Sequence, residues 1–385
     1  MPKAPIKTPS RSKPSRSRLT KPSIGRIDFV LLILVLILLG FGAIMIYDAS
    51  IVSAARDFGD KFFYLKNQLI WIGVGLVAMF IASRIDYHIY YHLALPAYVV
   101  CLVLLLLVFI PMLGIGAYGA HRWIDFRFFS FQPSEIMKLV LAIFLAAWLS
   151  ARENSHGFRD SVLPFLAIVA PVAGLILLQP DMGTMLVLVG MAFTVYFASG
   201  ANVLYFAGLL GAGVGGFLIF ALSSAYRRAR ILTFLDPTSD TRDTGYHINQ
   251  VLMSLGSGGI FGEGIGQSRG KYDYVPEVAN DSIFAVIGEE LGFIGSLALF
   301  TILGIFLYRG FRVASLAPDR FGQLLATGII GTIAIQTILN LGSMVSLFPL
   351  TGVPLPFISY GGSSMVVTLA AIGIILNISR QALVK

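Results

Sequence analysis

Four carboxylates stand out in the stretch VPEVANDSIFAVIGEELGFIG, which covers residues 275–295. Glu277 and Asp281 lie in its polar first part, whereas Glu289 and Glu290 lie inside the apolar run that follows. Asp281 stands where the apolar run begins, which suits a helix N-cap and the positive end of a helix dipole. A carboxylate in that position also suits a general base whose pKa is raised toward neutrality by partial burial. Position alone leaves both interpretations open.

Small residues follow Asp281 at helical spacing. Ala285, Gly288, Gly292 and Ser296 stand 4, 7, 11 and 15 residues after it, so all five share one helical face. We expect this face to press against a neighbouring helix.

Other charged residues lie at the edges of apolar runs. Glu135 and Lys138 are three residues apart in QPSEIMKL and can pair on one helix face. The pair either tolerates burial by neutralising its charges or serves function. Arg122, next to Trp123, fits an interfacial anchor or a guanidinium that grips phosphate oxygens.

Two short segments interrupt the apolar pattern. QPDMGT, residues 179–184, contains Asp181, which can cap the following helix or line a cavity. TGVPLPFISYGGSS, residues 351–364, contains two prolines and a Gly-Gly pair, which predict non-helical backbone at membrane depth. Such backbone is tolerated only where it is buried in protein or lines a wet cavity. Ser359 and Ser363 of this segment are candidate substrate contacts.

Several familiar motifs are absent from the sequence. There is no phosphate-binding G-x-x-x-x-G-K-[ST] loop, no H-E-x-x-H metal motif and no G-x-S-x-G nucleophile motif. Cys101 is the only cysteine, which excludes disulfides within the chain and a cysteine metal cluster. One candidate base, several cations and a cavity between helices remain. Together they suit an anionic, lipid-linked substrate or a transporter.

Transmembrane helices must position these residues. The chain is 56% hydrophobic and 12% charged, against about 25% charged residues in a typical soluble domain. The apolar runs predict an all-α, polytopic membrane protein with about ten spans. We expect them near residues 28–48, 68–84, 93–112, 133–150, 161–178, 183–200, 203–223, 282–308, 322–346 and 363–380. One large loop, about 224–281, joins the seventh and eighth spans and is long enough to suggest a function.

Basic residues set the predicted orientation. Residues 1–26 contain Lys and Arg but no acidic residue, and they predict a disordered tail on the cytoplasmic side. The membrane domain then covers residues 27–385. Ten spans place both termini in the cytoplasm and the 224–281 loop outside. Nucleic-acid binding is not expected, because no folded basic module accompanies the tail.

Four blocks in this order resemble the SEDS family, the bacterial shape, elongation, division and sporulation proteins. They are GAHRWIDFRFFSFQPSEIMKL, LLQPDMGT, YHINQVLMSLGSGGIFGEGIGQSRGKYDYVPEVANDSIFAVIGEELGFIG and NLGSMVSLFPLTGVPLPFISYGGSS. The resemblance spans nearly everything after residue 26. It is greater to the FtsW division branch than to RodA.

The resemblance implies a ten-helix peptidoglycan glycosyltransferase of the cytoplasmic membrane that polymerises lipid II on the outer side. The implied partners are a class B penicillin-binding protein and other membrane proteins of the divisome. The essential aspartate of the family lies in a P-E-x-x-x-D block, which here ends at Asp281. This sequence has Ala279 and Asn280 where the family commonly has His-Thr, which leaves the carboxylate in place.

In this interpretation Asp281 is the general base for the acceptor hydroxyl. Arg122, Lys138 and Lys271 stabilise the diphosphate leaving group, and Glu135 orients Lys138. Asp181, Glu277, Ser359 and Ser363 complete the candidate substrate-binding set. No cofactor is assigned, and a divalent cation such as Mg²⁺ or Mn²⁺ could share the work. Two alternatives are a lipid II flippase and a non-catalytic scaffold of the divisome.

Overall fold

The computed structural model of the protein describes residues 25, 27–110, 114–117, 120–125, 130–152, 157–222, 228, 234, 244–272 and 275–382. Apart from Gly25, the predicted tail at residues 1–26 lies outside the described residues. Most of residues 223–243, the first part of the predicted large loop, also lie outside them.

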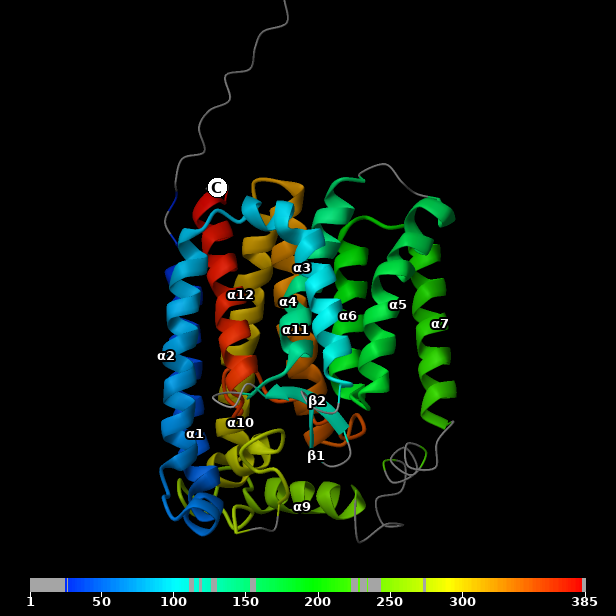
Figure 1. Cartoon of the computed structure of the whole chain (residues 1–385). Helices are drawn as coiled ribbons and strands as arrows, with labels where there is room; N and C mark the ends of the chain where they lie inside the picture. Colours follow the sequence, from blue (N-terminus) through cyan, green and yellow to red (C-terminus); the bar gives the residue numbers. More distant parts are fainter. Residues whose placement is uncertain are drawn as a thin grey trace, which may run out of the picture.

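The molecule is a bundle of apolar helices that run along one axis (Figure 1). Among the described residues, eight helices are long and apolar enough to cross a membrane, and α6 and α7 are shorter apolar helices beside them. The ten are α1 (Phe29–Phe58), α2 (Phe63–Arg84), α3 (His88–Leu107), α4 (Pro133–Ser150), α5 (Leu163–Leu178, preceded by the π-helix η1 at Phe158–Val162), α6 (Met182–Ala198), α7 (Val203–Leu222), α10 (Ile283–Ser315), α11 (Arg320–Met344) and α12 (Gly362–Gln381). The predicted polytopic helical membrane protein is confirmed.

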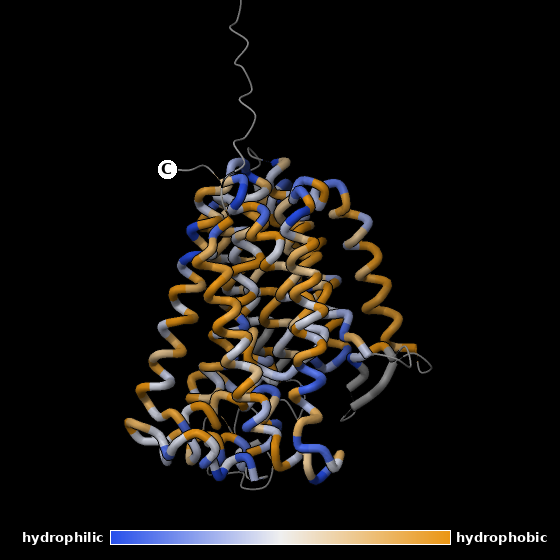
Figure 2. Tube along the Cα trace, turned by 90° about the vertical axis from the view of Figure 1, so that its left-hand side faces the viewer, coloured by the Kyte–Doolittle hydropathy of each residue, from blue (hydrophilic) through white to orange (hydrophobic). Residues whose placement is uncertain are grey.

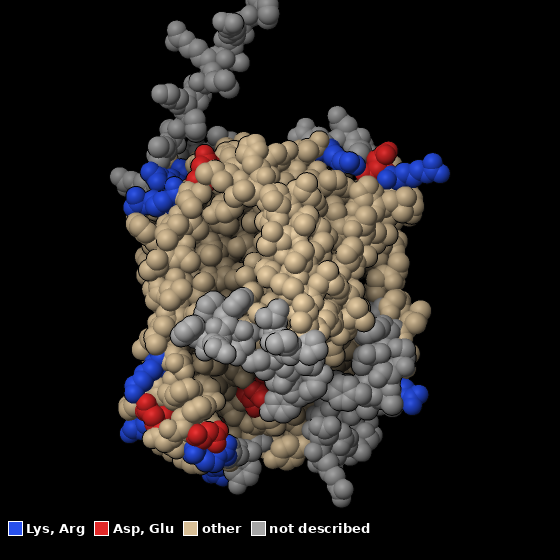
Figure 3. Space-filling view, in the orientation of Figure 1, with Lys and Arg blue, Asp and Glu red and all other residues tan. Residues whose placement is uncertain are grey.

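The surface of the bundle has the pattern that a bilayer requires. Apolar residues cover the middle of the helices (Figure 2), and the visible charged side chains gather near the two ends of the molecule (Figure 3). In contrast, α4 and α11 are largely enclosed by protein. Polar side chains on these two helices therefore face other helices rather than lipid.

The two ends of the bundle differ. At one end, which we call the terminal end, the Gly25 amide donates to the Arg380 carbonyl at 2.8 Å, so the first and last described segments meet. At the other, which we call the loop end, α9 (Thr244–Ser257) lies across the bundle (Figure 1). A small antiparallel sheet of order β1-β2-β3 also lies there, made of β1 (Gly114–Ala117), β2 (Ala120–Asp125) and β3 (Ser130–Phe131). The sequence analysis did not predict this sheet.

Several predicted span boundaries were wrong, among them the end of the span expected at 282–308, which continues in α10 to Ser315. The span expected at 93–112 is the helix α3 at His88–Leu107. The span expected to end at residue 48 continues as α1 to Phe58 and stops at Gly59, which has φ of +69°. The unbroken apolar run of the sequence ends before Asp48. Asp48 is nevertheless buried and ion-paired with Lys271, so the helix continues past it.

The predicted continuous small-residue face after Asp281 is interrupted. Gly288 does pack closely against Leu255 of α9. At Gly292, however, the backbone takes φ 64° and ψ −162°, which breaks the helical path of α10. A segment of the loop that follows α9 lies against this break, and its hydrogen bonds are described below.

Candidate active site at the loop end

Asp281 lies at the loop end, in the turn that leads into α10. The N-cap residue of α10 is Ser282, so the N-cap interpretation of Asp281 was wrong by one residue. The Asp281 carbonyl accepts a hydrogen bond from the Asn340 side-chain amide of α11 at 2.8 Å, and the same amide donates to the Val353 carbonyl at 2.8 Å. The backbone of Asp281 is thereby fixed, while the residue itself is only half-buried. A general base needs this combination of a fixed position and access.

Of the predicted non-helical segment 351–364, residues 351–361 are non-helical and much of this part is buried, whereas residues 362–364 form the first turn of α12. The non-helical part lies against the turn that carries Asp281. The Tyr360 amide donates to the Ala279 carbonyl at 2.9 Å, and a Cβ on Gly352 would lie 3.8 Å from Asp281 Oδ2. The irregular backbone therefore forms one wall beside the carboxylate.

The N-termini of three helices meet at Gln132, the N-cap residue of α4. Its side-chain amide donates to Asp181 Oδ2 at 3.2 Å, and its backbone amide donates to Ser363 Oγ in the first turn of α12 at 3.4 Å. Asp181 is buried and caps α6, since it accepts from the Thr184 amide at 3.1 Å and from the Thr184 hydroxyl at 2.9 Å. Of the two interpretations left open for Asp181, the helix cap is confirmed.

Arg122 lies on β2 and covers the approach to α6. Its guanidinium donates to the Gln179 carbonyl at 3.2 Å and to the Pro180 carbonyl. The first turn of α6 also touches the 351–361 segment, because a Cβ on Gly183 would overlap the Thr351 carbonyl oxygen. Arg122, α6 and the wall beside Asp281 are thus joined by direct contacts.

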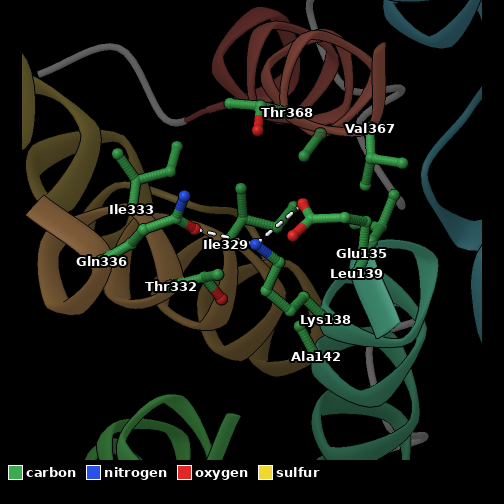
Figure 4. Close-up of a pocket in the computed structure, with 11 residues that line it drawn as sticks. Glu135, Lys138, Leu139, Ala142, Ile329, Thr332, Ile333, Gln336, Val367 and Thr368 are labelled. Atoms are coloured by element: carbon green, nitrogen blue, oxygen red, sulfur yellow. Dashed lines mark hydrogen bonds and ion pairs between the residues drawn. The ribbon is translucent and has the colours of Figure 1, made fainter. Parts of the chain in front are cut away.

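Glu135 and Lys138 form the predicted ion pair, with Lys138 Nζ 2.8 Å from Glu135 Oε2. Lys138 Nζ also donates to Gln336 Oε1 of α11 at 2.8 Å, and the Gln336 amide donates to the Pro354 carbonyl at 2.8 Å. Figure 4 shows these side chains around a cavity of about 30 Å³ between α4, α11 and α12. A cavity of that size, with Glu135, Lys138 and Gln336 among mostly apolar lining residues, has room for a water molecule or two.

Five membrane helices, α2, α4, α6, α10 and α12, begin at the loop end. Each helix N-terminus carries about half a positive charge and unpaired N–H groups, which makes it a site for anions. Within the described residues, Phe62, Gln132 and Ser282 at the N-caps of α2, α4 and α10 make no side-chain capping bond, and Gly361 at the N-cap of α12 has no side chain. Only Asp181 of α6 accepts a capping hydrogen bond on its side chain. The loop end therefore has a positive backbone potential near the half-buried carboxylate of Asp281.

Glu277 and Ser359 have local structural contacts. The Glu277 carboxylate accepts a hydrogen bond from the Asn280 side chain, and Glu277 has φ of +50°. Asn280 thus stabilises the turn before Asp281 in a sequence that lacks the common His-Thr pair. Ser359 is buried, and its hydroxyl accepts from the Leu355 amide at 2.8 Å. Ser359 therefore shapes the wall rather than exposing its hydroxyl.

Lys271 is not grouped with the other candidate cations. Its ammonium donates to Asp48 Oδ1 at 2.9 Å, to the Gly266 carbonyl at 2.7 Å and to Glu290 Oε1 at 3.2 Å, so all three N–H groups are used. Burial alone lowers the pKa of Lys271, but the hydrogen bond and charge of Asp48 and of Glu290 raise it above its usual value. Lys271 therefore stays charged and is held in a separate cluster.

Comparison with known proteins places this arrangement in a family. The family model described as "Cell cycle protein", which covers FtsW, RodA and SpoVE, matches residues 29–383. The chain belongs to this family. It is 44% identical to stage V sporulation protein E of Bacillus subtilis over 356 residues, which are 92% of this chain and 97% of that protein. It is 40% identical over 365 residues to a protein of Geobacter metallireducens named probable peptidoglycan glycosyltransferase FtsW, with 94% and 97% covered.

Solved structures of the same family share the fold. A chain from a peptidoglycan synthase complex that coordinates polymerization and crosslinking superimposes with a TM-score of 0.76 and 31% identity, covering 92% of this chain and 98% of that one. The rod shape determining protein RodA of Thermus thermophilus superimposes with a TM-score of 0.69 and 30% identity, covering 93% and 98%.

Sequence reasoning missed four polar residues that organise this FtsW/RodA/SpoVE-family site. Gln336 and Asn340 are buried amides four residues apart on α11, and polar residues inside an apolar span were a usable signal. The third is Gln132, whose contact partner Asp181 lies 49 residues further along the chain. The fourth is His247 of α9, whose Nε2 lies 2.7 Å from the Ser282 hydroxyl, and no local pattern predicted that contact.

Proposed function

We propose that this protein is a peptidoglycan glycosyltransferase that polymerises lipid II, with Asp281 as the general base. One observation carries the proposal: the half-buried Asp281 carboxylate lies beside the non-helical segment 351–361. The N-termini of α6 and α12 and the Glu135–Lys138 pair are connected to the same segment. The site thus combines one base with a surface suited to an anion. The names of the relatives support the same activity.

The chemistry is a displacement at a sugar carbon. The 4-hydroxyl of the acceptor sugar gives its proton to Asp281 while its oxygen attacks the anomeric carbon of the donor strand. The bond from that carbon to the lipid diphosphate breaks, and the diphosphate leaves with the electron pair. A positioned base contributes about 10²–10⁴-fold to such a reaction.

The leaving diphosphate gains negative charge, which the loop end is suited to stabilise. The helix N-termini supply fixed backbone dipoles, and Arg122 and Lys138 supply full charges. Among the residues that the structure describes, no three His, Cys, Asp or Glu side chains are placed to hold a metal ion. Lys271 is left out of this role because its donors are used elsewhere.

The loop end faces outward in this proposal, and the membrane is the bacterial cytoplasmic membrane. The arginines Arg84, Arg309, Arg312, Arg320 and Arg380 lie at helix ends on the terminal end, which the positive-inside rule assigns to the cytoplasm. We also propose a class B penicillin-binding protein as partner, since a similar chain belongs to a complex that couples polymerization with crosslinking.

The test is polymerisation of lipid II by the purified protein, alone and with its transpeptidase, read as glycan ladders on a gel. Wild-type protein should make polymer and Asp281→Ala should not. Polymer from Asp281→Ala at the wild-type rate would remove Asp281 from the mechanism. A lipid II flippase is distinguished by Asp281→Glu, which keeps the charge but moves the carboxylate by one methylene. That change should damage base catalysis, because the carboxylate is displaced from the reacting hydroxyl, and it should spare transport.

The cellular role is tested separately. The chain is similar both to FtsW and to a sporulation protein, and we propose the septal role. A fluorescent fusion should gather at the division septum, and depletion should give filaments. Uniform distribution with loss of cell width control would instead indicate elongation.

A further inference from the structure

A second group of buried charges lies outside the site described above. We call it the Lys271 cluster, and its members are Asp48 of α1, Ser268 and Lys271 of the loop after α9, and Glu289 and Glu290 of α10. Ser268 and Lys271 are at most 4% exposed, and Glu289 and Glu290 at most 2%. The mechanism above uses none of the five.

Glu289 binds three consecutive residues of the loop. Its Oε2 accepts from the Ser268 hydroxyl at 2.7 Å and from the Gly270 amide at 3.2 Å, and its Oε1 accepts from the Arg269 amide at 2.8 Å. Both oxygens are therefore acceptors, and each of the three donors is fixed by the same side chain.

Glu290 uses one oxygen only. Its Oε1 accepts from the Ser268 amide at 3.0 Å and from Lys271 Nζ at 3.2 Å, and Lys271 continues to Asp48. Within the described residues, Glu290 Oε2 and Asp48 Oδ2 are buried and accept no hydrogen bond from a donor group. The two carboxyls share the Lys271 ammonium, whose Nζ lies 2.9 Å from Asp48 Oδ1 and 3.2 Å from Glu290 Oε1.

Backbone hydrogen bonds also join the loop after α9 to α10 at this position. At the break in α10, the amides of Glu263 and Gly264 donate to the carbonyls of Glu289 and Glu290 at 3.0 and 3.1 Å. On the other side of the break, the amides of Phe293 and Ile294 donate to the carbonyls of residues 259 and 260 at 2.9 and 3.1 Å. The loop after α9 is thus paired with the broken helix along both its backbone and its side chains.

This pairing joins the two ends of a chain segment that runs from Lys271 to Glu290, and Asp281 lies within that segment. The chain leaves the cluster at Lys271, passes through the turn that carries Asp281, and returns along the first turns of α10 to Glu289 and Glu290. We propose that Glu289 is a positioning residue for catalysis, which sets the location of Asp281 by fixing Ser268, Arg269 and Gly270 to the helix that follows Asp281. Its effect on activity rests on the proposed glycosyltransferase function.

The hydrogen-bond pattern predicts opposite results for the same substitution at two adjacent residues. Glu289→Gln replaces an accepting oxygen with an NH₂ group that faces buried donors, so at least one loop donor loses its partner. Glu290→Gln keeps Oε1 as an acceptor. Its new NH₂ group replaces Oε2, which accepts no hydrogen bond from a donor group, and this NH₂ group can donate to Asp48. Glu263→Gln is the matched control, because Glu263 lies in the same loop but is exposed, and its carboxylate is 3.9 Å from Arg269 Nε.

The experiment measures lipid II polymerisation and hydrogen–deuterium exchange on the full-length protein and the three variants. For Glu289→Gln we expect kcat to fall roughly tenfold or more, with KM within about threefold and the shape of the pH–rate profile unchanged, because a buried donor is left unpaired and the base itself is intact. Amides of residues 268–281 should exchange about tenfold faster. Glu290→Gln and Glu263→Gln should remain within about threefold of wild type in both measurements.

Equal effects of Glu289→Gln and Glu290→Gln would overturn the proposal, since charge alone would then matter. Lower activity of Glu289→Gln without faster exchange would also overturn it. If Glu289→Gln does not fold, Ser268→Ala removes only one of the three bonds and should give an intermediate effect in the same direction; no effect would refute the proposal. If wild-type protein makes no polymer, the proposed function fails, and the exchange data alone decide whether Glu289 fixes the loop.

Discussion

Two regions of the loop end bury charged groups in different ways. In the region around Asp281, the candidate groups retain capacity for a ligand: the carboxylate is half-buried, the N-termini of α4, α10 and α12 have no side-chain cap within the described residues, and Lys138 borders a cavity. In the Lys271 cluster, the ammonium uses every donor, and Glu289 uses both oxygens.

The difference separates groups that can act on a substrate from groups that hold the fold. A buried charge with all its partners satisfied gains nothing from a ligand and costs stability when a partner is removed. A half-buried charge beside unpaired backbone donors can exchange water for substrate. Lys271 is charged and close to Asp281 in sequence, but these two properties do not make it a substrate contact. Its hydrogen bonds therefore give no support to the prediction that Lys271 binds substrate.

The largest expected effect is on activity, at Asp281 itself. Asp281→Asn should lower polymerisation by about 10²–10⁴-fold, because the amide cannot accept the proton of the attacking hydroxyl. The melting temperature should change little, because the Asn340 bond reaches the backbone carbonyl and asparagine keeps a side-chain oxygen that can accept from the Ser282 hydroxyl, as Asp281 Oδ1 does at 3.5 Å. A large drop in melting temperature would show that this region also holds the fold and would remove the contrast between the two regions.

The next effect is on stability, at the ion pair of α4. Lys138→Met leaves Glu135 buried without its cation, which should cost about 3–5 kcal/mol in the free energy of unfolding. The double variant Glu135→Gln with Lys138→Met should recover most of that loss, because no charge remains uncompensated. Denaturant unfolding in detergent measures both. A double variant as unstable as the single one would mean that packing around Lys138, rather than charge, is what matters.

A smaller loss is expected where the loop crosses the break in α10. Gly262 has φ of +82°, and a Cβ there would overlap the Glu290 carbonyl oxygen. Gly262→Ala should therefore destabilise the protein by roughly 1–3 kcal/mol or more, because an L-residue is strained there and the backbones must separate. Gly256→Ala is the control, because Gly256 has no atom within 4 Å of a new Cβ. Equal melting temperatures for the two variants would contradict the close pairing described here.

The smallest effect is expected at the α6 cap. Asp181→Ala removes the acceptor for the Thr184 amide and should cost about 1 kcal/mol, whereas Asp181→Asn should retain most of the cap. Thermal unfolding of the two variants checks this. If Asp181→Asn lost activity while keeping its stability, Asp181 would contact substrate in addition to capping α6.

Much of the fold followed from local patterns in the sequence. The apolar runs, the Glu135–Lys138 pair at i, i+3 and the irregular 351–361 segment were all predicted. The break in α10 was not, because Gly292 is compatible with a helix and only the loop that lies against it selects the broken path. The end of α1 was missed for a related reason, since the partner of Asp48 lies 223 residues away at Lys271.

The sequence by itself determined that this protein is a helical membrane bundle with charged residues at the helix ends. It also marked Asp281 as the candidate base by resemblance. Hydropathy and helical spacing are properties of near neighbours, so they can be read along the chain. Only the tertiary structure decided which buried charges pair with one another, because a charge in a low-dielectric interior takes its partner from whichever segment the fold brings within hydrogen-bonding distance. That choice separated Lys271 from Asp281 and joined Gln132, Gln336 and Asn340 to the site.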